Sequence, residues 1–333
     1  MTLAGPLVDR IGRVHTDLRV SVTDRCNLRC YYCMPAWGVD FRPHAAILSF
    51  EEITRVVGVA ARLGIRKLRL TGGEPLVRKG ICDLVAMLAR IPGIEDVALT
   101  TNAVLLAPLA QPLRAAGLHR LNISLDTLDR KRFKDISLRD ELPQVLAGID
   151  AAMAAGFRQI KLNTVAIRGR TEQDVVPLAH FARQRGLSLR FIEVMPLDGD
   201  ARWTRKMVLT GAEILEILGQ HFGPLVPVSA PGDRAPAREY RFPDGQGTIG
   251  IIATVSQPFC ARCSRLRLTS EGQIRNCLFS REVWDARGVL RSGGSDEDLA
   301  RLFHAAVGAK KEQHGTDTGH LAPPAHAMHE IGG

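Results

Sequence analysis

Cys26, Cys30 and Cys33 stand at a CxxxCxxC spacing with no fourth cysteine nearby in the sequence. A structural zinc ion takes four protein ligands in a closed tetrahedron, and this stretch supplies only three. Iron–sulfur clusters are held by cysteine thiolates, so a four-iron cluster bound by three thiolates keeps one iron open for a small molecule. The spacing therefore favours an open cluster, and half of a zinc site completed from elsewhere is the alternative.

A second triplet consists of Cys260, Cys263 and Cys277, and it again supplies three thiolates. A zinc ribbon would need a second CxxC pair where a single cysteine follows, although a histidine could complete a zinc site here. Two triplets in a chain without an export signal favour metal or cluster ligation over disulfides. The seventh cysteine, Cys82, lies in the apolar run 81–85 and is predicted to be a buried structural thiol.

Arg265 and Arg267 follow Cys263 in a predicted strand. Because they are two residues apart, both side chains face one way, and Leu266 faces the other. Two guanidinium groups beside an open iron make a receptor for a molecule that carries phosphates. An ordinary surface pair of arginines is the alternative.

Length and composition allow a cytoplasmic enzyme of ordinary size. The 333 residues suffice for one barrel-sized domain plus a smaller one, and 45% hydrophobic with 24% charged residues is typical of globular proteins. We expect neither export nor a membrane span, because no run approaches the ~18 apolar residues that a spanning helix needs. The net charge of +9 comes from scattered basic residues, so no nucleic-acid surface is predicted.

The elements that must position these residues alternate along the chain in a strand-then-helix rhythm. Strands are predicted at 18–23, 66–70, 94–101, 120–125, 159–167 and 189–195, and helices at 49–63, 80–90, 105–116, 142–155 and 171–185. Such repeats imply a parallel sheet with right-handed crossovers. The repeats are too few for an eightfold barrel, so we predict an open (β/α)6 partial TIM barrel at residues 1–200. Residues 201–333 lose the rhythm and are predicted as a smaller α+β region with a helix at 210–221, a loop at 224–236, and strands at 238–242 and 248–255.

Function in such folds gathers at the C-terminal ends of the strands, and polar residues follow the predicted strands at these ends. They are the Thr-Gly-Gly-Glu-Pro run at 71–75, Thr100 to Asn102, Ser124 and Asp126, Lys161 and Asn163, and Arg190 and Glu193. The two glycines allow backbone to approach a ligand closely, since neither has a Cβ. A plain tight turn is the alternative for this run.

The first triplet resembles the radical S-adenosylmethionine (SAM) superfamily, whose signature is CxxxCxΦC with an aromatic residue before the last cysteine. Tyr32 holds that position, and the Gly-Gly-Glu-Pro run one βα unit later resembles the superfamily's second motif. The resemblance implies a radical SAM fold and a 4Fe–4S cluster on Cys26, Cys30 and Cys33, whose open iron binds SAM and whose electron yields a 5′-deoxyadenosyl radical. Residues at matching SAM-contacting positions are Tyr32, Gly73, Ser124 and Arg190.

The whole pattern, with CxxCxRxR, a third cysteine and a terminal Gly-Gly, resembles the GTP 3′,8-cyclase family from about Asp9 to Gly333. This resemblance implies an auxiliary 4Fe–4S cluster on the second triplet. It also implies catalytic roles for Arg265, Arg267, Gly332 and Gly333, the last two in a tail that reaches the active site. The residues implied to bind GTP are Arg19, Arg69, Thr100, Lys161, Met195, Arg265, Leu266 and Arg267.

The implied reaction is that of a lyase converting GTP to 3′,8-cyclo-7,8-dihydro-GTP by hydrogen abstraction from the ribose C3′, the first step of molybdenum cofactor (molybdopterin) biosynthesis. The implied partners are GTP, an external one-electron reductant, and a downstream cyclic pyranopterin monophosphate synthase by product hand-off. No nucleic acid or membrane is expected, and a homodimer is compatible with the pattern.

Two alternatives to this function stay open at the level of the sequence. One is another radical SAM enzyme with an auxiliary cluster, such as a peptide maturase, but those usually carry more C-terminal cysteines and lack CxRxR. The other is a non-enzymatic protein with two zinc sites that binds RNA.

Three departures from the family pattern affect only local loop geometry: Ala36-Trp37 in place of acidic residues, Ala103 in place of glycine, and Thr171 in place of asparagine. Five of the ten histidines fall near the C-terminus without a ligand-like spacing, at positions 304, 314, 320, 326 and 329. We therefore expect a solvated tail for all but its final residues.

Overall fold

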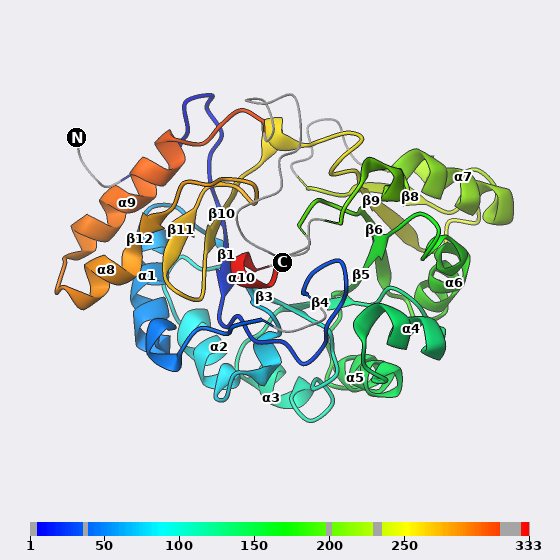
Figure 1. Cartoon of the computed structure of the whole chain (residues 1–333), viewed down its shortest axis with the longest axis horizontal. Helices are drawn as coiled ribbons and strands as arrows, with labels where there is room; N and C mark the ends of the chain where they lie inside the picture. The colour runs from blue at the N-terminus through cyan, green and yellow to red at the C-terminus, as the bar shows by residue number, and fades with distance from the viewer. Residues whose placement is uncertain (1–4, 36–38, 198–201, 229–234, 314–327, 333) are drawn as a thin grey trace.

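The computed structural model describes residues 5–35, 39–197, 202–228, 235–313 and 328–332. Its centre is a set of parallel strands in which each pairs with the next along the chain. They are β1 (Asp17–Ser21), β2 (Lys67–Thr71), β3 (Asp96–Thr101), β4 (Arg120–Ser124), β5 (Ile160–Ala166) and β6 (Ser188–Glu193). The predicted open, partial barrel is confirmed, and Figure 1 shows the strands inside an outer arc of helices.

The helices of this arc follow the strands in sequence. They are α1 (Phe50–Arg62), α2 (Ile81–Ala89), α3 (Ala110–Ala115), α4 (Arg130–Ser137), α5 (Leu142–Ala154) and α6 (Val175–Gln184). The capping box predicted at the start of α1 is present, since the Ser49 hydroxyl accepts a hydrogen bond from the Glu52 amide and the Glu52 carboxylate accepts one from the Ser49 amide. These caps satisfy amide groups that would otherwise lack partners at the helix end.

Some helix boundaries differ from the prediction. The helix expected at 105–116 begins only at Ala110, because Ala103 turns the chain with a φ of 62° and Pro108 has no amide hydrogen to donate. The helix expected from Thr171 starts as a 3₁₀ turn and becomes α-helical at Val175. The sequence does not predict the short helix α4, because only Phe133 and Ile136 form its buried apolar face. Asp129 caps this helix by accepting a hydrogen bond from the Arg132 amide.

The C-terminal region extends the same sheet at both edges. Beyond β6 lie β9 (Thr248–Ile252), β8 (Arg238–Arg241) and β7 (Val226–Pro227); beyond β1 lie β10 (Arg265–Leu268), β11 (Gln273–Arg275) and β12 (Trp284–Asp285). Both strands that join the barrel run parallel to the barrel strand beside them, β9 to β6 and β10 to β1, and antiparallel to their outer neighbours. The sheet is therefore continuous across the region near residue 200 where the predicted boundary lies.

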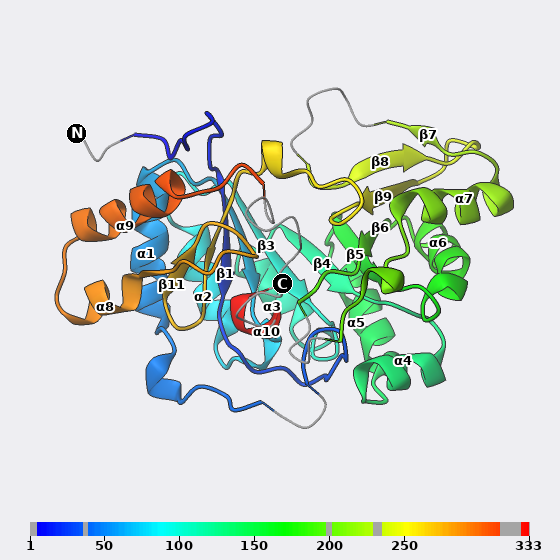
Figure 2. The ribbon, with the colours of Figure 1, turned by 45° about the horizontal axis from the view of Figure 1, so that its top comes forward.

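The remaining helices are α7 (Gly211–Phe222), α8 (Ala286–Arg291), α9 (Asp296–Gly308) and α10 (Met328–Ile331). In Figures 1 and 2, α8 and α9 lie beside α1, whereas α10 lies inside the concave face of the sheet. The expectation of a solvated tail is wrong for His304, which belongs to α9, whose apolar face is buried. The positions 314, 320 and 326 lie outside the described residues. Among the described helices, none is long and apolar enough to cross a membrane.

The alternation of side chains along each strand decides which residues can reach the concave face. In β5, Ile160 and Leu162 are buried in the hydrophobic core, whereas Lys161, Asn163 and Val165 are only partly buried. Side chains of a strand point alternately to its two faces, so this pattern directs one set toward the helices and the other into the barrel. The same alternation in β1 puts Arg19 on the inner face.

Candidate active site

A cavity of about 310 Å³ lies on the inner face of the barrel, and both cysteine triplets line it. The predicted site residues that line it with the cysteines are Arg19, Tyr32, Arg69, Gly73, Thr100, Ser124, Arg190, Met195, Arg265 and Arg267. Residues more than 200 positions apart thus share one site because β10, from the C-terminal region, pairs with β1. Tyr32, Gly73, Thr100, Ser124 and Met195 lie at or just after the C-terminal ends of strands, as expected for this fold, whereas the arginines lie within strands.

Three of the predicted residues that the structure describes do not line the cavity: Lys161, Leu266 and Gly332. Lys161 lies one inward-facing position before Asn163, which does line it. The Leu266 side chain is fully buried in the hydrophobic core, so only its backbone faces the second triplet. Gly332 lies against the strand ends beside the cavity, and Gly333 falls outside the described residues.

The first triplet occupies one loop that follows β1. Turn hydrogen bonds from the amides of Cys33 and Met34 to the Cys30 carbonyl, both 2.9 Å, shape the loop. The Leu28 amide lies 3.4 Å and the Asn102 side-chain amide 3.9 Å from the Cys26 sulfur, so both donate to it. The sequence predicts Asn102 as a polar residue at a strand end, but it does not predict the contact with Cys26.

The Gly-Gly-Glu-Pro turn packs directly on this loop. A Cβ on Gly73 would lie 2.4 Å from the Arg25 carbonyl oxygen, and the Glu74 amide donates to that oxygen at 2.7 Å. The glycine is therefore required for the backbone-to-backbone approach of two loops, a reason that differs from the ligand contact considered above. The turn therefore fixes the start of the cysteine loop through its contact with the Arg25 carbonyl.

Two buried carboxyl groups stand behind the first triplet. Glu74 accepts hydrogen bonds from the Thr101 hydroxyl, the Asn102 amide and the Leu76 amide, and its burial raises its pKa to about 7. Asp126 accepts from the Tyr32 hydroxyl at 2.5 Å, and its burial raises its pKa to about 6. Asp126 joins the end of β4 to the cysteine loop and keeps Tyr32 in a fixed position, whereas Glu74 joins its own turn to the end of β3.

The second triplet comes from two chain segments. Cys260 and Cys263 belong to a 3₁₀ turn before β10, and Cys277 follows β11. The Arg13 guanidinium donates to the Cys260 carbonyl at 2.7 Å. Burial alone would raise the pKa of Cys263, but the nearby Arg265 and Lys310 outweigh it and lower that pKa to about 6.

A cluster of cations surrounds the cavity. Burial, reinforced by repulsion between neighbouring cations, lowers the pKa of Arg69 to about 10, that of Arg267 to about 9 and that of Lys161 to about 8. The pKa of Arg19 is lowered by burial and by Arg267. Burial and mutual repulsion both disfavour these positive charges, so the cluster attracts an anion that offsets them. Guanidinium groups bind phosphate oxygens especially well.

Two buried polar atoms in the cavity wall also indicate a polar ligand. The Thr100 hydroxyl and the side-chain oxygen (Oδ1) of Asn163 have no hydrogen-bond partner among the described residues. Unsatisfied buried polar groups are rare in folded proteins because each costs about 1–3 kcal/mol. A bound molecule that reaches both strands would satisfy them.

The last described residues reach the cavity wall. The Arg267 guanidinium donates to the Gly332 carbonyl, and the Met328 amide donates to the Leu197 carbonyl at 3.2 Å. Gly332 has a φ of 75°, and a Cβ there would lie 3.1 Å from both Ser21 and Thr71. The backbone at this position is therefore suited to glycine, and it contacts β1, β2 and β10 together.

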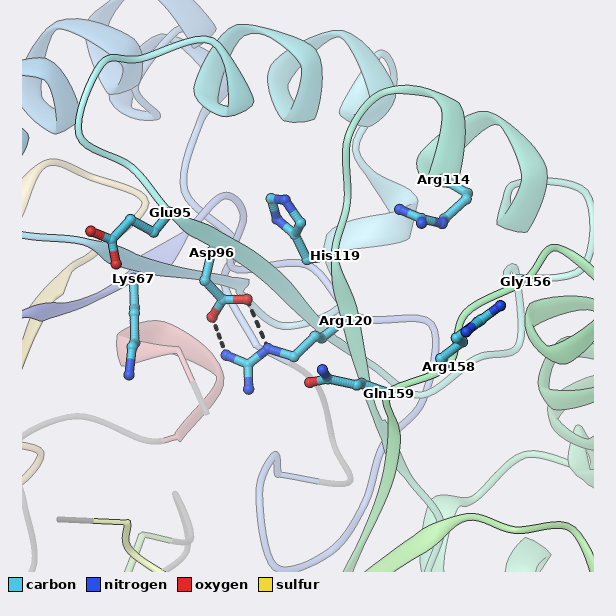
Figure 3. A pocket seen from close by; sticks show the side chains of 9 residues that line it. All are labelled: Lys67, Glu95, Asp96, Arg114, His119, Arg120, Gly156, Arg158 and Gln159. Atoms are coloured by element: carbon cyan, nitrogen blue, oxygen red, sulfur yellow. Dashed lines mark hydrogen bonds and ion pairs between the residues drawn. The ribbon is translucent and has the colours of Figure 1, made fainter. Parts of the chain in front are cut away.

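A second pocket, of about 440 Å³, opens at the opposite ends of the strands (Figure 3). Arg120 there forms a two-pronged ion pair with Asp96, and Lys67 and His119 lie beside them. Neither cysteine triplet lines this pocket. The cavity with both triplets is therefore the candidate active site.

The donor set fits iron–sulfur clusters. None of the seven cysteines forms a disulfide within the described residues, and six of them line the cavity. No three Cys, His, Asp or Glu side chains in the described part of the chain are arranged to hold one metal ion. A four-iron cluster accepts each thiolate at a different iron, so it does not require such an arrangement.

Comparison with known proteins agrees with this geometry. Residues 20–182 match the family model of the radical SAM superfamily, and residues 187–316 match the model Molybdenum Cofactor Synthesis C. The GTP 3′,8-cyclase of Rhodopirellula baltica is 49% identical over 330 residues, covering 98% of this chain and 92% of that one. The GTP 3′,8-cyclase of Paenarthrobacter nicotinovorans is 48% identical, covering 98% and 97%.

Among solved structures, Streptococcus suis SuiB bound to S-adenosylmethionine superposes with a TM-score of 0.64 at 14% sequence identity. The likeness covers 87% of this chain and 68% of that one. At this identity it shows a shared fold.

Proposed function

The chain belongs to the GTP 3′,8-cyclase family of radical SAM enzymes, and from that membership we propose how its two cysteine triplets and the cations around them divide the work. The enzyme is a lyase that converts GTP to 3′,8-cyclo-7,8-dihydro-GTP in molybdenum cofactor biosynthesis. The observation that carries the proposal is that both triplets line one cavity together with five arginines.

The first triplet holds the 4Fe–4S cluster that a radical SAM enzyme uses with SAM. When bound, the cluster and SAM supply the 5′-deoxyadenosyl radical that takes the hydrogen from C3′ of the ribose. Tyr32 and Gly73 hold SAM near the cysteine loop, while Ser124 contacts it from the end of β4 and Arg190 from the middle of β6. Asn102 orients Cys26 through the hydrogen bond to its sulfur.

The second triplet holds an auxiliary 4Fe–4S cluster with one iron open to the guanine base. Support comes from its three thiols and from the positive charges of Arg265 and Lys310, which favour the thiolate of Cys263. Thiolates are the ligands that such clusters need, so this electrostatic setting suits cluster binding.

The triphosphate binds to the cations between the two triplets. Arg265 and Arg267 point into the cavity from β10, and Arg19 and Arg69 occupy neighbouring positions in β1 and β2. Lys161 joins them from β5. Each is a hydrogen-bond donor to phosphate, and holding GTP on one side and SAM on the other sets the reacting atoms in near-attack geometry.

The tail contributes to closing the site. Met328 lines the cavity and Gly332 lies against β1 and β2, so the last residues cover part of its wall. A radical intermediate requires a site from which water and other hydrogen donors are excluded. Gly333 lies outside the described residues, and its role in catalysis belongs to the same proposal.

The wider organisation follows from this division. Residues 1–200 form the part that binds SAM, and residues 201–333 supply the auxiliary cluster and the tail. An external reductant provides the electron, and the product passes to cyclic pyranopterin monophosphate synthase.

The test is anaerobic incubation of the reconstituted enzyme with SAM, a reductant and GTP deuterated at C3′. We expect 5′-deoxyadenosine that carries the deuterium, together with a cyclised nucleotide. Iron and sulfide analysis should give about eight iron atoms per chain, as two 4Fe–4S clusters require. Zinc in place of iron at either triplet would contradict the proposal.

A further inference from the structure

Lys310, which follows α9, is a buried cation next to the second triplet. Only 7% of its surface is exposed. Its ammonium group donates to the Arg265 carbonyl and the Asn276 carbonyl, both at 2.7 Å, and to the Cys263 sulfur at 3.7 Å. An ammonium group has three N–H donors and no acceptor, so these three partners satisfy it completely.

The three partners belong to the two segments that carry the triplet. Arg265 lies two residues after Cys263, and Asn276 lies immediately before Cys277. Lys310 therefore connects the segment with the CxxC pair to the segment with the third cysteine. Within the described residues, no other side chain donates hydrogen bonds to both the Arg265 carbonyl and the Asn276 carbonyl.

The surroundings hold Lys310 in place. Its own amide donates to the Val307 carbonyl at 3.0 Å, and the Asn276 side chain donates to the Ala306 carbonyl at 2.9 Å. Arg13 donates to the carbonyls of Lys311 and Glu312 as well as to that of Cys260. The end of α9, the N-terminal segment and the cysteine turn are thus fastened to one another around the ammonium group.

Among the residues that the structure describes, no carboxylate forms an ion pair with this ammonium group. The ion pairs of the described residues do not include Lys310, and Arg13 and Arg265 are further cations nearby. A buried charge without an opposite partner is costly. The groups near it that can carry negative charge are the Cys263 sulfur, which it contacts, and Cys277, so the ammonium group is in place for an anionic cluster bound through these thiolates.

We propose that Lys310 is a positioning residue for the auxiliary cluster: it joins the two segments that carry the second triplet and supplies the positive charge that offsets the thiolate-bound cluster. This inference rests on the proposed auxiliary cluster. A cation and an N–H···S hydrogen bond both favour the reduced cluster, so Lys310 also raises the cluster's reduction potential. The first triplet, whose sulfur contact comes from the neutral Asn102, is independent of Lys310.

The experiment compares the variants Lys310→Met and Lys310→Arg with Lys311→Met, an exposed control one residue further on. Each full-length protein is reconstituted anaerobically, and iron and sulfide per chain are measured together with circular dichroism. For Lys310→Met we expect about half of the wild-type iron to be lost, or a bound cluster with a lower midpoint potential. Lys310→Arg keeps the charge and should retain more iron than the methionine variant, and Lys311→Met should match the wild type.

The potential is measured in a background in which Cys26, Cys30 and Cys33 are all alanine, so that only the second triplet can hold a cluster. If Lys310→Met fails to fold, Lys310→Gln, which keeps an N–H donor without the charge, takes its place with the same expected shift. Wild-type iron content and an unchanged midpoint potential in the uncharged variant would overturn the inference. A wild-type protein that binds only about four irons would instead refute the auxiliary cluster itself.

Discussion

The two cysteine triplets line the same cavity, but they differ in the number of chain segments that supply them and in the charge of the groups around them. The first lies in one loop, and burial raises the pKa of Cys26 to about 11 and that of Cys33 to about 12. The second spans two segments, and cations lower the pKa of Cys263 to about 6 despite its burial. Carboxyl groups stand behind the first triplet, and guanidinium and ammonium groups stand around the second.

This contrast matches the two molecules that the enzyme brings together. The sulfonium of SAM is a cation, and the triphosphate of GTP is a strong anion. In the proposed arrangement SAM lies near the carboxyl groups at one end of the cavity and GTP near the cations at the other, because the reverse would place the sulfonium among cations. The asymmetry around the triplets supports this proposed orientation.

The largest effects are expected from removing one thiolate of either triplet. Cys26→Ala and Cys260→Ala should each lower turnover by roughly a thousandfold or more, equivalent to ~4 kcal/mol, because the cluster or its geometry is lost. The two should differ in SAM cleavage: Cys26→Ala stops it, whereas Cys260→Ala leaves cleavage uncoupled from cyclisation. The measurement is the ratio of 5′-deoxyadenosine to cyclised nucleotide. Full product formation by Cys260→Ala would remove the auxiliary cluster from the mechanism.

The next effect tests the basic end of the cavity. Arg267→Ala should weaken GTP binding by roughly 1.5–3 kcal/mol, the usual scale for a hydrogen bond to a charged group. SAM binding should change little, because SAM is proposed to bind at the first triplet and Arg267 lies beside the second. The measurement is calorimetric titration with GTP and with guanosine. An unchanged ratio of the two affinities would show that Arg267 does not contact the phosphates.

The C-terminal tail lies between the strand ends and the basic side of the cavity. Gly332 lies close to Ser21 and Thr71 on one side and accepts a hydrogen bond from Arg267 on the other. Deleting Gly332 and Gly333 should leave iron content and fold intact while hydrogen abstraction falls about tenfold or more, equivalent to ~1.4 kcal/mol of transition-state stabilisation. Deuterium transfer from 3′-deuterated GTP measures that step. Unchanged transfer would mean that the tail is dispensable.

A smaller effect depends on pH. Burial and the nearby Arg190 lower the pKa of Lys161 to about 8, so this group is charged at pH 7 and neutral at pH 9. Because the charged form attracts phosphate, GTP affinity should fall several-fold as the pH rises through 8. Lys161→Arg, which stays charged, should lack this fall between pH 7 and 9. An identical pH profile for both proteins would assign the dependence to another group.

The smallest effect is expected at the cysteine outside both triplets. Cys82 is half-buried in α2, and burial raises its pKa, so it remains a thiol. Cys82→Ser should keep full iron content and activity, with a stability cost of at most about 1 kcal/mol for the added polarity. Thermal unfolding and iron analysis check this. Loss of iron would give Cys82 a ligand role.

The sequence predicted more of the first triplet's surroundings than of the second's. The βα rhythm located all strands of the barrel, and the cysteine loop followed directly from its spacing. It did not reveal that Gly73 serves backbone packing against Arg25, nor that Asp126 holds Tyr32. These contacts join residues about 50 and 94 positions apart, and local patterns carry no information on such pairs.

Local chemistry thus predicted the barrel, the proposed cluster ligands and the basic character of the site, because thiolate number, strand period and charge are properties of short stretches. Tertiary structure alone decided that β10 pairs with β1, that Lys310 lies between the two segments of the second triplet, and that Gly332 rests against β1 and β2. Each of these depends on bringing distant segments together, which is governed by the packing of the whole core rather than by any one segment.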